Sequence, residues 1–105
     1  MQPTQVQEAV GPQFQGQVVR PYSQTRDGNR ILRSFSEKVQ LSELKWHRDS
    51  MNRNVTVISG KGWKIQFDNQ LPVDLTEGTI HFIPKDAWHR VHRGEGDLVI
   101  LIEEF

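Results

Sequence analysis

Apolar and polar residues alternate in short runs from position 30 to the C-terminus, and turn residues separate these runs. Period-two alternation over roughly four to eight residues is typical of strands in an antiparallel sheet. Helical spacing is scarcely visible. The pattern predicts strands at 30–35, 43–47, 54–59, 63–68, 73–75, 79–83, 89–92 and 98–103. The sequence therefore predicts an all-β domain whose sheet closes into a sandwich or barrel.

Glycine-rich segments mark the turns between several of the predicted strands. The segments 60–62 and 93–97 each lie between two alternating runs and predict hairpins. The segment 68–72, which ends in Pro72, predicts a third corner. The last run, 98–102, is continuously apolar. Strands that are covered on both faces have this pattern, so we expect this strand at the centre of the body.

The segment from Gly78 to His89 predicts a strand that ends at a rigid corner. Ile80 and Phe82 alternate with polar neighbours, and Pro84 lacks the N–H donor that a continuing sheet requires. We expect the chain to turn after Pro84 and to present His89 just beyond the turn.

The first 29 residues differ in texture from the rest of the chain. They are rich in glutamine, contain three prolines and carry only scattered apolar residues. We interpret 1–29 as an extended N-terminal arm and 30–105 as the barrel domain. The arm is either a flexible tail or a segment that orders against another subunit through Phe14, Val18 and Val19.

Composition limits the classes of partner and of site. Thirteen basic and thirteen acidic residues cancel, which argues against a nucleic-acid or anionic-membrane partner. The absence of cysteine excludes disulfides, thiolate zinc sites and cysteine nucleophiles. No apolar run approaches the roughly 20 residues that span a bilayer, so we expect a soluble, cytoplasmic protein. A body of roughly 75 residues has a small core, which favours a homo-oligomer, with a dimer as the first expectation.

The strongest candidate chemistry lies at His47, Asp49 and His89. His47 and Asp49 are two residues apart, so on an extended segment their side chains share a face. If His89 faces the same interior, the three form a 2-His-1-carboxylate set that leaves coordination positions for water, oxygen or a substrate. Iron(II) is the first expectation, and manganese, nickel, cobalt or zinc also suit these ligands. The alternative is a pair of histidines that hydrogen-bond to nearby groups and bind no metal.

Other polar and aromatic residues have two interpretations each. By alternation His81 shares a face with Ile83 and is interpreted as structural, whereas His92 is out of phase with His89 and falls on the outer face. Arginines can hold a substrate carboxylate or form exposed ion pairs, and tryptophans can line a pocket or fill the core. The residues that we expect to bind a small-molecule ligand are Trp63, Gln66, Phe82, Arg53 and Arg90.

The corner before His89 resembles the second motif of the cupin superfamily. That motif has a glycine, five residues, a proline, a spacer, a second glycine, two residues and a histidine, and Gly78, Pro84 and His89 fall on it. Asp86 stands at the place of the second glycine, which leaves the shape of the corner open. Arg93 replaces the asparagine that ends the motif.

The segment around His47 resembles the first cupin motif in part. That motif has a histidine, one residue, a histidine, three or four residues, a glutamate, six residues and a glycine, which His47, Asp49, Arg53 and Gly60 match in position. Asp49 can still ligate a metal, whereas the cation Arg53 is not expected to bind one. The resemblance implies a double-stranded β-helix, or jelly-roll, barrel in which the four-ligand site is reduced to three.

The resemblance implies several functions. The reduced ligand set also resembles the facial triad of iron(II) and 2-oxoglutarate-dependent oxygenases, and the whole pattern is similar to small stand-alone cupins of bacteria and tailed phages. These likenesses imply a metal-binding cupin, an iron(II)-type dioxygenase or a related metalloenzyme that acts on a small molecule in the cytoplasm of a cell or of a phage host. The alternatives are a non-catalytic scaffold for assembly, as in a virion, and a small-ligand sensor. Because cupins serve many functions, the site has to decide among them.

Overall fold

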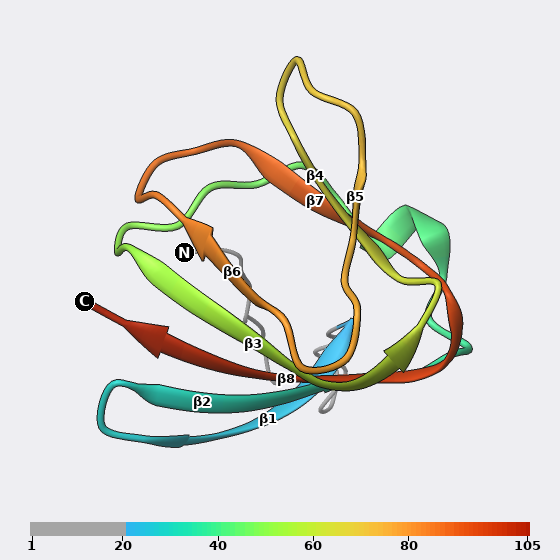
Figure 1. Cartoon of the computed structure of the whole chain (residues 1–105), viewed down its shortest axis with the longest axis horizontal. Helices are drawn as coiled ribbons and strands as arrows, with labels where there is room; N and C mark the ends of the chain where they lie inside the picture. The colour runs from blue at the N-terminus through green and yellow to red at the C-terminus, as the bar shows by residue number, and fades with distance from the viewer. Residues whose placement is uncertain (1–20) are drawn as a thin grey trace, which may run out of the picture.

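Two antiparallel sheets enclose the core of the protein (Figure 1). The computed structural model describes residues 21–105. The larger sheet has the strand order β1-β2-β8-β3-β6, and the smaller has the order β5-β4-β7. The elements are β1 (Tyr22–Asp27), β2 (Arg30–Phe35), the 3₁₀ helix η2 (Leu41–Glu43), β3 (Arg53–Lys61), β4 (Lys64–Phe67), β5 (Val73–Asp74), β6 (Ile80–Ile83), β7 (His89–His92) and β8 (Glu95–Glu104). The predicted all-β barrel is confirmed.

Two predictions about the first half of the chain are wrong. The segment 43–47 is no strand, because η2 covers its start and only His47 pairs with a strand, in an isolated bridge to His89. The barrel also begins before residue 30, because β1 pairs with β2 from Tyr22 to Asp27. Alternation did not reveal β1 because Tyr22 is its only apolar residue. The remainder of the expected arm, residues 1–20, lies outside the described residues.

The glycine-rich segments expected to form hairpins instead join the two sheets. The segment 60–62 leads from β3 to β4, and 93–97 leads from β7 to β8, so each carries the chain from one sheet to the other. The two connections pack tightly on each other, since a Cβ atom on Gly94 would lie 2.3 Å from the carbonyl oxygen of Lys61 and 2.4 Å from the nitrogen of Trp63. Glycine at position 94 therefore lets the two sheets close on each other.

The core lies between the sheets, and β8 is its central strand, as expected. β8 lies between β2 and β3 and buries Leu98, Ile100 and Ile102, while Val99 and Leu101 on its other face are only half-buried. At the first residue of β3 the inward-facing side chains are charged instead of apolar. Arg53 lies there, in register with Glu104 on β8. The barrel thus has one apolar end and one charged end, and the candidate site lies at the charged end.

The corner between β6 and β7 is held by backbone hydrogen bonds. Asp86 has a φ of 64°, in the left-handed region that glycine adopts most readily and that aspartate tolerates. Its N–H donates to the carbonyl of Asp49 at 2.7 Å, and the N–H of Ala87 donates to the carbonyl of Pro84 at 3.2 Å. Asp86 therefore takes the left-handed conformation that glycine favours, and the turn survives the substitution. The same turn ties the loop that carries Asp49 to the segment before His89.

We expect substitutions at Asp86 to follow the cost of a positive φ. Asp86→Gly keeps the free energy of unfolding within about 0.5 kcal/mol of wild type, while Asp86→Ala lowers it by about 1 kcal/mol because alanine resists this conformation. Urea unfolding of the two variants measures the difference. A more stable alanine variant would contradict a left-handed Asp86.

Candidate metal centre

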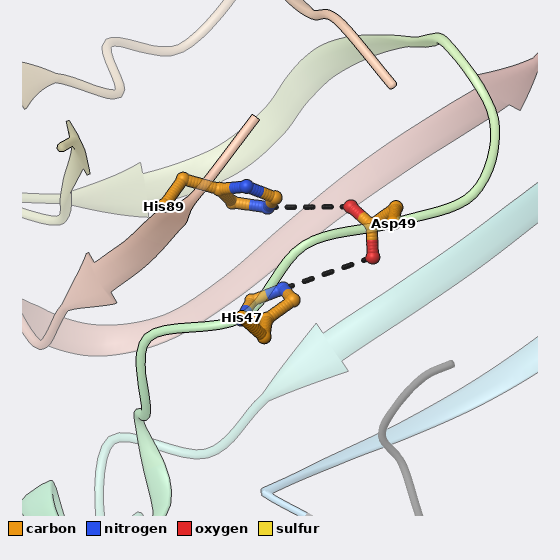
Figure 2. Close-up of side chains that lie close together, drawn as sticks. All are labelled: His47, Asp49 and His89. Atoms are coloured by element: carbon orange, nitrogen blue, oxygen red, sulfur yellow. Dashed lines mark ion pairs between the residues drawn. The ribbon is translucent and has the colours of Figure 1, made fainter. Parts of the chain in front are cut away.

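A single bridge of backbone hydrogen bonds brings the two candidate histidines together. The N–H of His47 donates to the carbonyl of His89 at 3.0 Å, and the N–H of His89 donates to the carbonyl of His47 at 2.9 Å. Directly opposed residues of an antiparallel pair have neighbouring side chains, and the two imidazole centroids are 4.3 Å apart. The loop between η2 and β3 thus delivers His47 to the first residue of β7 (Figure 2).

Both imidazoles are fixed in the same tautomer by their own backbones. Nδ1 of His47 lies 2.9 Å from the carbonyl oxygen of Lys45, and Nδ1 of His89 lies 2.8 Å from that of Ala87. A carbonyl oxygen can only accept, so each Nδ1 carries the hydrogen. In the neutral imidazoles each Nε2 is then left with a lone pair, which is the form that ligates a metal. Burial and then the neighbouring His89 lower the pKa of His47, which favours its neutral form.

The carboxylate of Asp49 faces both Nε2 atoms, as Figure 2 shows. Its Oδ1 lies 3.9 Å from Nε2 of His47, and its Oδ2 lies 3.3 Å from Nε2 of His89. Burial opposes ionisation of Asp49, but a hydrogen bond from Nε2 of His89 when that imidazole carries both protons, together with the charge of Arg53, outweighs burial and lowers the pKa of the carboxyl to about 2. Oδ2 is buried and meets no hydrogen-bond donor at a suitable angle within residues 21–105.

These three side chains can hold a divalent cation. Their donor atoms lie within 4.8 Å of one another, and across residues 21–105 they form the one cluster of at least three ligating side chains. Two lone pairs and an anionic oxygen that point toward one another repel unless a cation lies among them. Two nitrogens and one carboxylate oxygen suit iron(II), manganese, cobalt, nickel or zinc. The donor set therefore fits a metal.

Arg53 holds the carboxylate of Asp49 from the other side. Its Nη1 lies 3.2 Å from Oδ2 of Asp49, while its Nε and Nη2 donate to Oε2 of Glu104 at 3.1 and 2.7 Å. Glu104 is in turn paired with Arg26 at 3.1 Å. The arginine at the place of the cupin glutamate thus orients a ligand carboxylate, and its donors are engaged by these two acids. Its expected contact with a substrate stays a prediction.

Most of the other residues expected to bind a ligand lie away from the triad. Trp63 is fully buried in the core, where its Nε1 donates to the carbonyl of Gly96 at 3.1 Å. Phe82 is on the outer face of β6, is half-exposed and packs on Phe105 with ring centroids 6.0 Å apart. Phe82 does not line the barrel interior, because its strand register points it outward, and its expected contact with a ligand stays a prediction.

Gln66 and Arg90 lie on the outer face of the smaller sheet. They pair in register, and Nε of Arg90 donates to Oε1 of Gln66 at 3.0 Å. His92 lies on this face too, with its Nε2 2.8 Å from the same oxygen. Inward-facing His89 alternates with both Arg90 and His92 along β7, so neither Gln66 nor Arg90 faces the triad. Their expected contact with a substrate stays a prediction.

The described surface also has a small aromatic pocket beside the histidine bridge. Trp46, Asp68 and Trp88 line a pocket of ≈ 300 Å³. The bridge places Arg90 across from Trp46 and Arg48 across from Trp88, and the guanidinium carbons lie 4.6 and 5.3 Å from the respective ring centroids. Alternation puts this pocket on the side of the bridge away from the imidazoles.

Sequence reasoning missed two inward side chains near the triad. Phe67 packs against His89 with ring centroids 6.0 Å apart. Arg33 is a buried cation on the inner face of β2, between Ile31 and Phe35. The alternation Ile31, Arg33, Phe35 was the available signal, because it assigns the arginine to the same face as two core residues.

The fold matches known structures, although no family model and no curated protein matches the sequence. A cupin domain from Bordetella pertussis covers 83% of this chain and 97% of its own, with a TM-score of 0.57 and 20% identity. A cupin-2 domain protein from Shewanella frigidimarina covers 79% and 80%, also with a TM-score of 0.57 and 20% identity. This chain therefore has the fold of these two cupin domains.

Iron enzymes and lyases share this cupin fold. An iron(II) form of HppE matches with a TM-score of 0.59 and 14% identity, over 80% of this chain and 48% of its own. A structure from a study of DMSP lyases matches with a TM-score of 0.61 and 17% identity, over 71% of this chain and 36% of its own. The chain therefore spans about a third to a half of these larger proteins. Within residues 21–105 no helix is long and apolar enough to cross a membrane.

We expect Arg53 to contribute far more to stability than an exposed arginine. Arg53→Leu leaves the buried carboxylate of Asp49 and the partly buried carboxylate of Glu104 without their shared cation, and lowers the free energy of unfolding by about 3 kcal/mol. The matched control Arg30→Leu removes an exposed pair and costs less than about 1 kcal/mol. Urea unfolding measures both, and equal losses would contradict the assigned pairing. The double variant Arg53→Leu with Glu104→Gln recovers part of the loss.

Proposed function

We propose that this chain is a metal-dependent cupin that binds one divalent ion, iron(II) first, through Nε2 of His47, the carboxylate of Asp49 and Nε2 of His89. The proposal rests on the surroundings of Oδ2 of Asp49, which lies 3.3 Å from Nε2 of His89 and accepts no hydrogen bond within residues 21–105. Arg53 balances the charge of the carboxylate from one side. On the other side the two Nε2 lone pairs of the neutral imidazoles face the carboxylate with no cation among them, and a metal ion there relieves their repulsion.

The residues around the triad support a reaction on a small molecule. Bound iron(II) supplies Lewis acidity and access to dioxygen chemistry. Asp49 and His89 are buried, whereas His47 is about a third exposed, so a substrate reaches the site from the His47 side. Arg53 fixes the orientation of Asp49, and the two backbone carbonyls fix the imidazoles. Structural neighbours described as Fe(II)-HppE and as hydroxypropylphosphonic acid epoxidase support an iron-dependent oxidation as the reaction class.

Metal loading tests the proposed function. Wild-type protein incubated without oxygen with iron(II), manganese(II), cobalt(II), nickel(II) or zinc(II) and then desalted retains about one equivalent, measured by elemental analysis. Asp49→Asn and His89→Gln lose the metal because each removes a ligand. The controls His81→Gln and His92→Gln retain it, since these histidines bond to Thr79 and Gln66.

Two results would overturn the metal proposal. One is wild-type protein that retains no ion from any of these metals, and the other is equal retention in the triad variants and the controls. Oxygen-electrode measurements on the iron-loaded protein with a panel of small molecules then separate an oxygenase from other metalloenzymes. Oxygen uptake has to disappear in His89→Gln if the triad is responsible.

A second candidate function is self-assembly, which the outer face of the larger sheet supports. Leu32, Leu101, Thr56 and Ile80 lie opposite one another across β2, β8, β3 and β6, and we call this row the outer stripe. Leu32 and Ile80 are half-exposed or more, as is Phe82 beside them. Contiguous exposed apolar side chains mark protein contacts in soluble proteins. The proposed occupant is a second copy of this chain, in the dimer expected from the small core.

Light scattering tests the dimer. We expect a mass about twice the 12.2 kDa of the chain, and a shift to the monomer mass in Ile80→Lys, because a buried lysine at the contact is costly. Leu71→Lys is the control, since Leu71 is exposed in the loop after β4 and lies outside the outer stripe. A monomeric wild type, or a dimer that survives Ile80→Lys, would contradict this assembly.

A further inference from the structure

Arg33 is a buried cation that the triad does not use. Its side chain projects from β2 into the barrel interior and is 9% exposed. Its Nε donates to Oε1 of Gln24 at 2.8 Å, and its guanidinium carbon lies 3.8 Å above the centroid of the Tyr22 ring. One edge and one face of the guanidinium are therefore occupied by neighbours on β1, which fix its plane.

Within residues 21–105 no carboxylate lies within ion-pair distance of Arg33, and Asp49 and Glu104 act on its charge only from farther away. Three other arginines of the larger sheet form ion pairs. Arg26 and Arg53 share Glu104, and Arg30 pairs with Glu103. Burial lowers the pKa of Arg33 to about 10, so the guanidinium is still charged at neutral pH. A buried charge without a counter-ion is costly, and its Nη1–Nη2 edge is the geometry that binds oxyanions with two hydrogen bonds.

Arg33 faces the same interior as the triad. It pairs in register with Ile100 on β8, which pairs with Val57 on β3, and the inward positions that follow along β3 toward its start are Val55 and Arg53. The electrostatic contacts agree with this placement, because Arg33 lowers the pKa of His47 while the charge of Asp49 raises the pKa of Arg33. Arg33 therefore lies on the inner face of the same barrel that holds the triad.

We propose that Arg33 binds the anionic group of the substrate, a carboxylate or a phosphoryl-type oxyanion, while another part of the same molecule lies at the triad. This assignment rests on the proposed metal-dependent function. It replaces Arg53 and Arg90 as the anion anchor, because Arg53 is engaged by Asp49 and Glu104 and Arg90 lies on the outer face. The substrate class is then a small organic acid. Gln24 and Tyr22 are the positioning residues that hold the guanidinium edge toward the interior.

Anion titrations of the metal-free protein test the assignment independently of the metal. Acetate and methylphosphonate are titrated into full-length protein and followed by NMR on the arginine Nε–H signals, with acetamide as the uncharged probe. We expect the Arg33 signal of wild type to shift with the anions and not with acetamide. Arg33→Gln weakens anion binding by roughly ten- to a hundredfold, because two charge-assisted hydrogen bonds are lost. Arg33→Lys retains part of it.

The control variant and a metal assay keep the outcomes distinct. Arg90→Gln retains wild-type anion affinity, and Arg33→Gln retains wild-type metal loading, if the anion site is Arg33 alone. If Arg33→Gln weakens the binding of only one of the two anions, that anion identifies the group that the site accepts, and the proposal is supported. An unshifted Arg33 signal in wild type, or anion affinity in Arg33→Gln equal to wild type, overturns it. Wild type that binds anions at Arg33 but no metal would refute the proposed function and leave the anion site standing.

Discussion

The backbone bridge between His47 and His89 is the interaction on which the site depends. Without it, the loop after η2 has no fixed relation to the start of β7, and the two imidazoles do not meet. A third hydrogen bond, from the N–H of Asp86 to the carbonyl of Asp49, ties the same loop to the corner between β6 and β7. All three bonds use backbone groups, which leaves the three side chains available for chemistry. The site is thus assembled by the chain path and not by contacts among its own side chains.

The charged end of the barrel contains more buried charges and lone pairs than its ion pairs can balance. Glu104 is shared by Arg26 and Arg53, and Arg53 reaches on to Asp49. This chain of alternating charges leaves the imidazole lone pairs and one oxygen of Asp49 facing one another, and leaves Arg33 without a carboxylate within the described residues. Burying such groups without partners costs stability, and groups of this kind cluster at functional sites. A cation at the triad and an anion at Arg33 together satisfy both demands, and a small acid bound to a metal supplies them.

Much of the fold and the triad could be predicted because both depend on local patterns. The bounds of β2 and β7 follow from alternation, and the spacing of His47 and Asp49 puts both on one face. The same rule could have excluded Arg90, which is adjacent to inward-facing His89. β1 was hidden because an edge strand with a polar inner position shows no hydrophobic period. The sequence did not single out Arg33 because what distinguishes it is the lack of a nearby carboxylate within the described residues. Which side chains are neighbours across strands is known only once the strand register is known.

In their neutral forms both histidines present a bare Nε2 to Asp49, since Nδ1 of each donates to a backbone carbonyl. Long-range proton–nitrogen NMR correlation spectra of the metal-free protein report this tautomer directly. We expect the neutral imidazoles of His47 and His89 to carry the proton on Nδ1 and none on Nε2, and both Nε2 signals to change when zinc is added. A proton on Nε2 of either neutral imidazole, or Nε2 signals that zinc leaves unchanged, would contradict this arrangement.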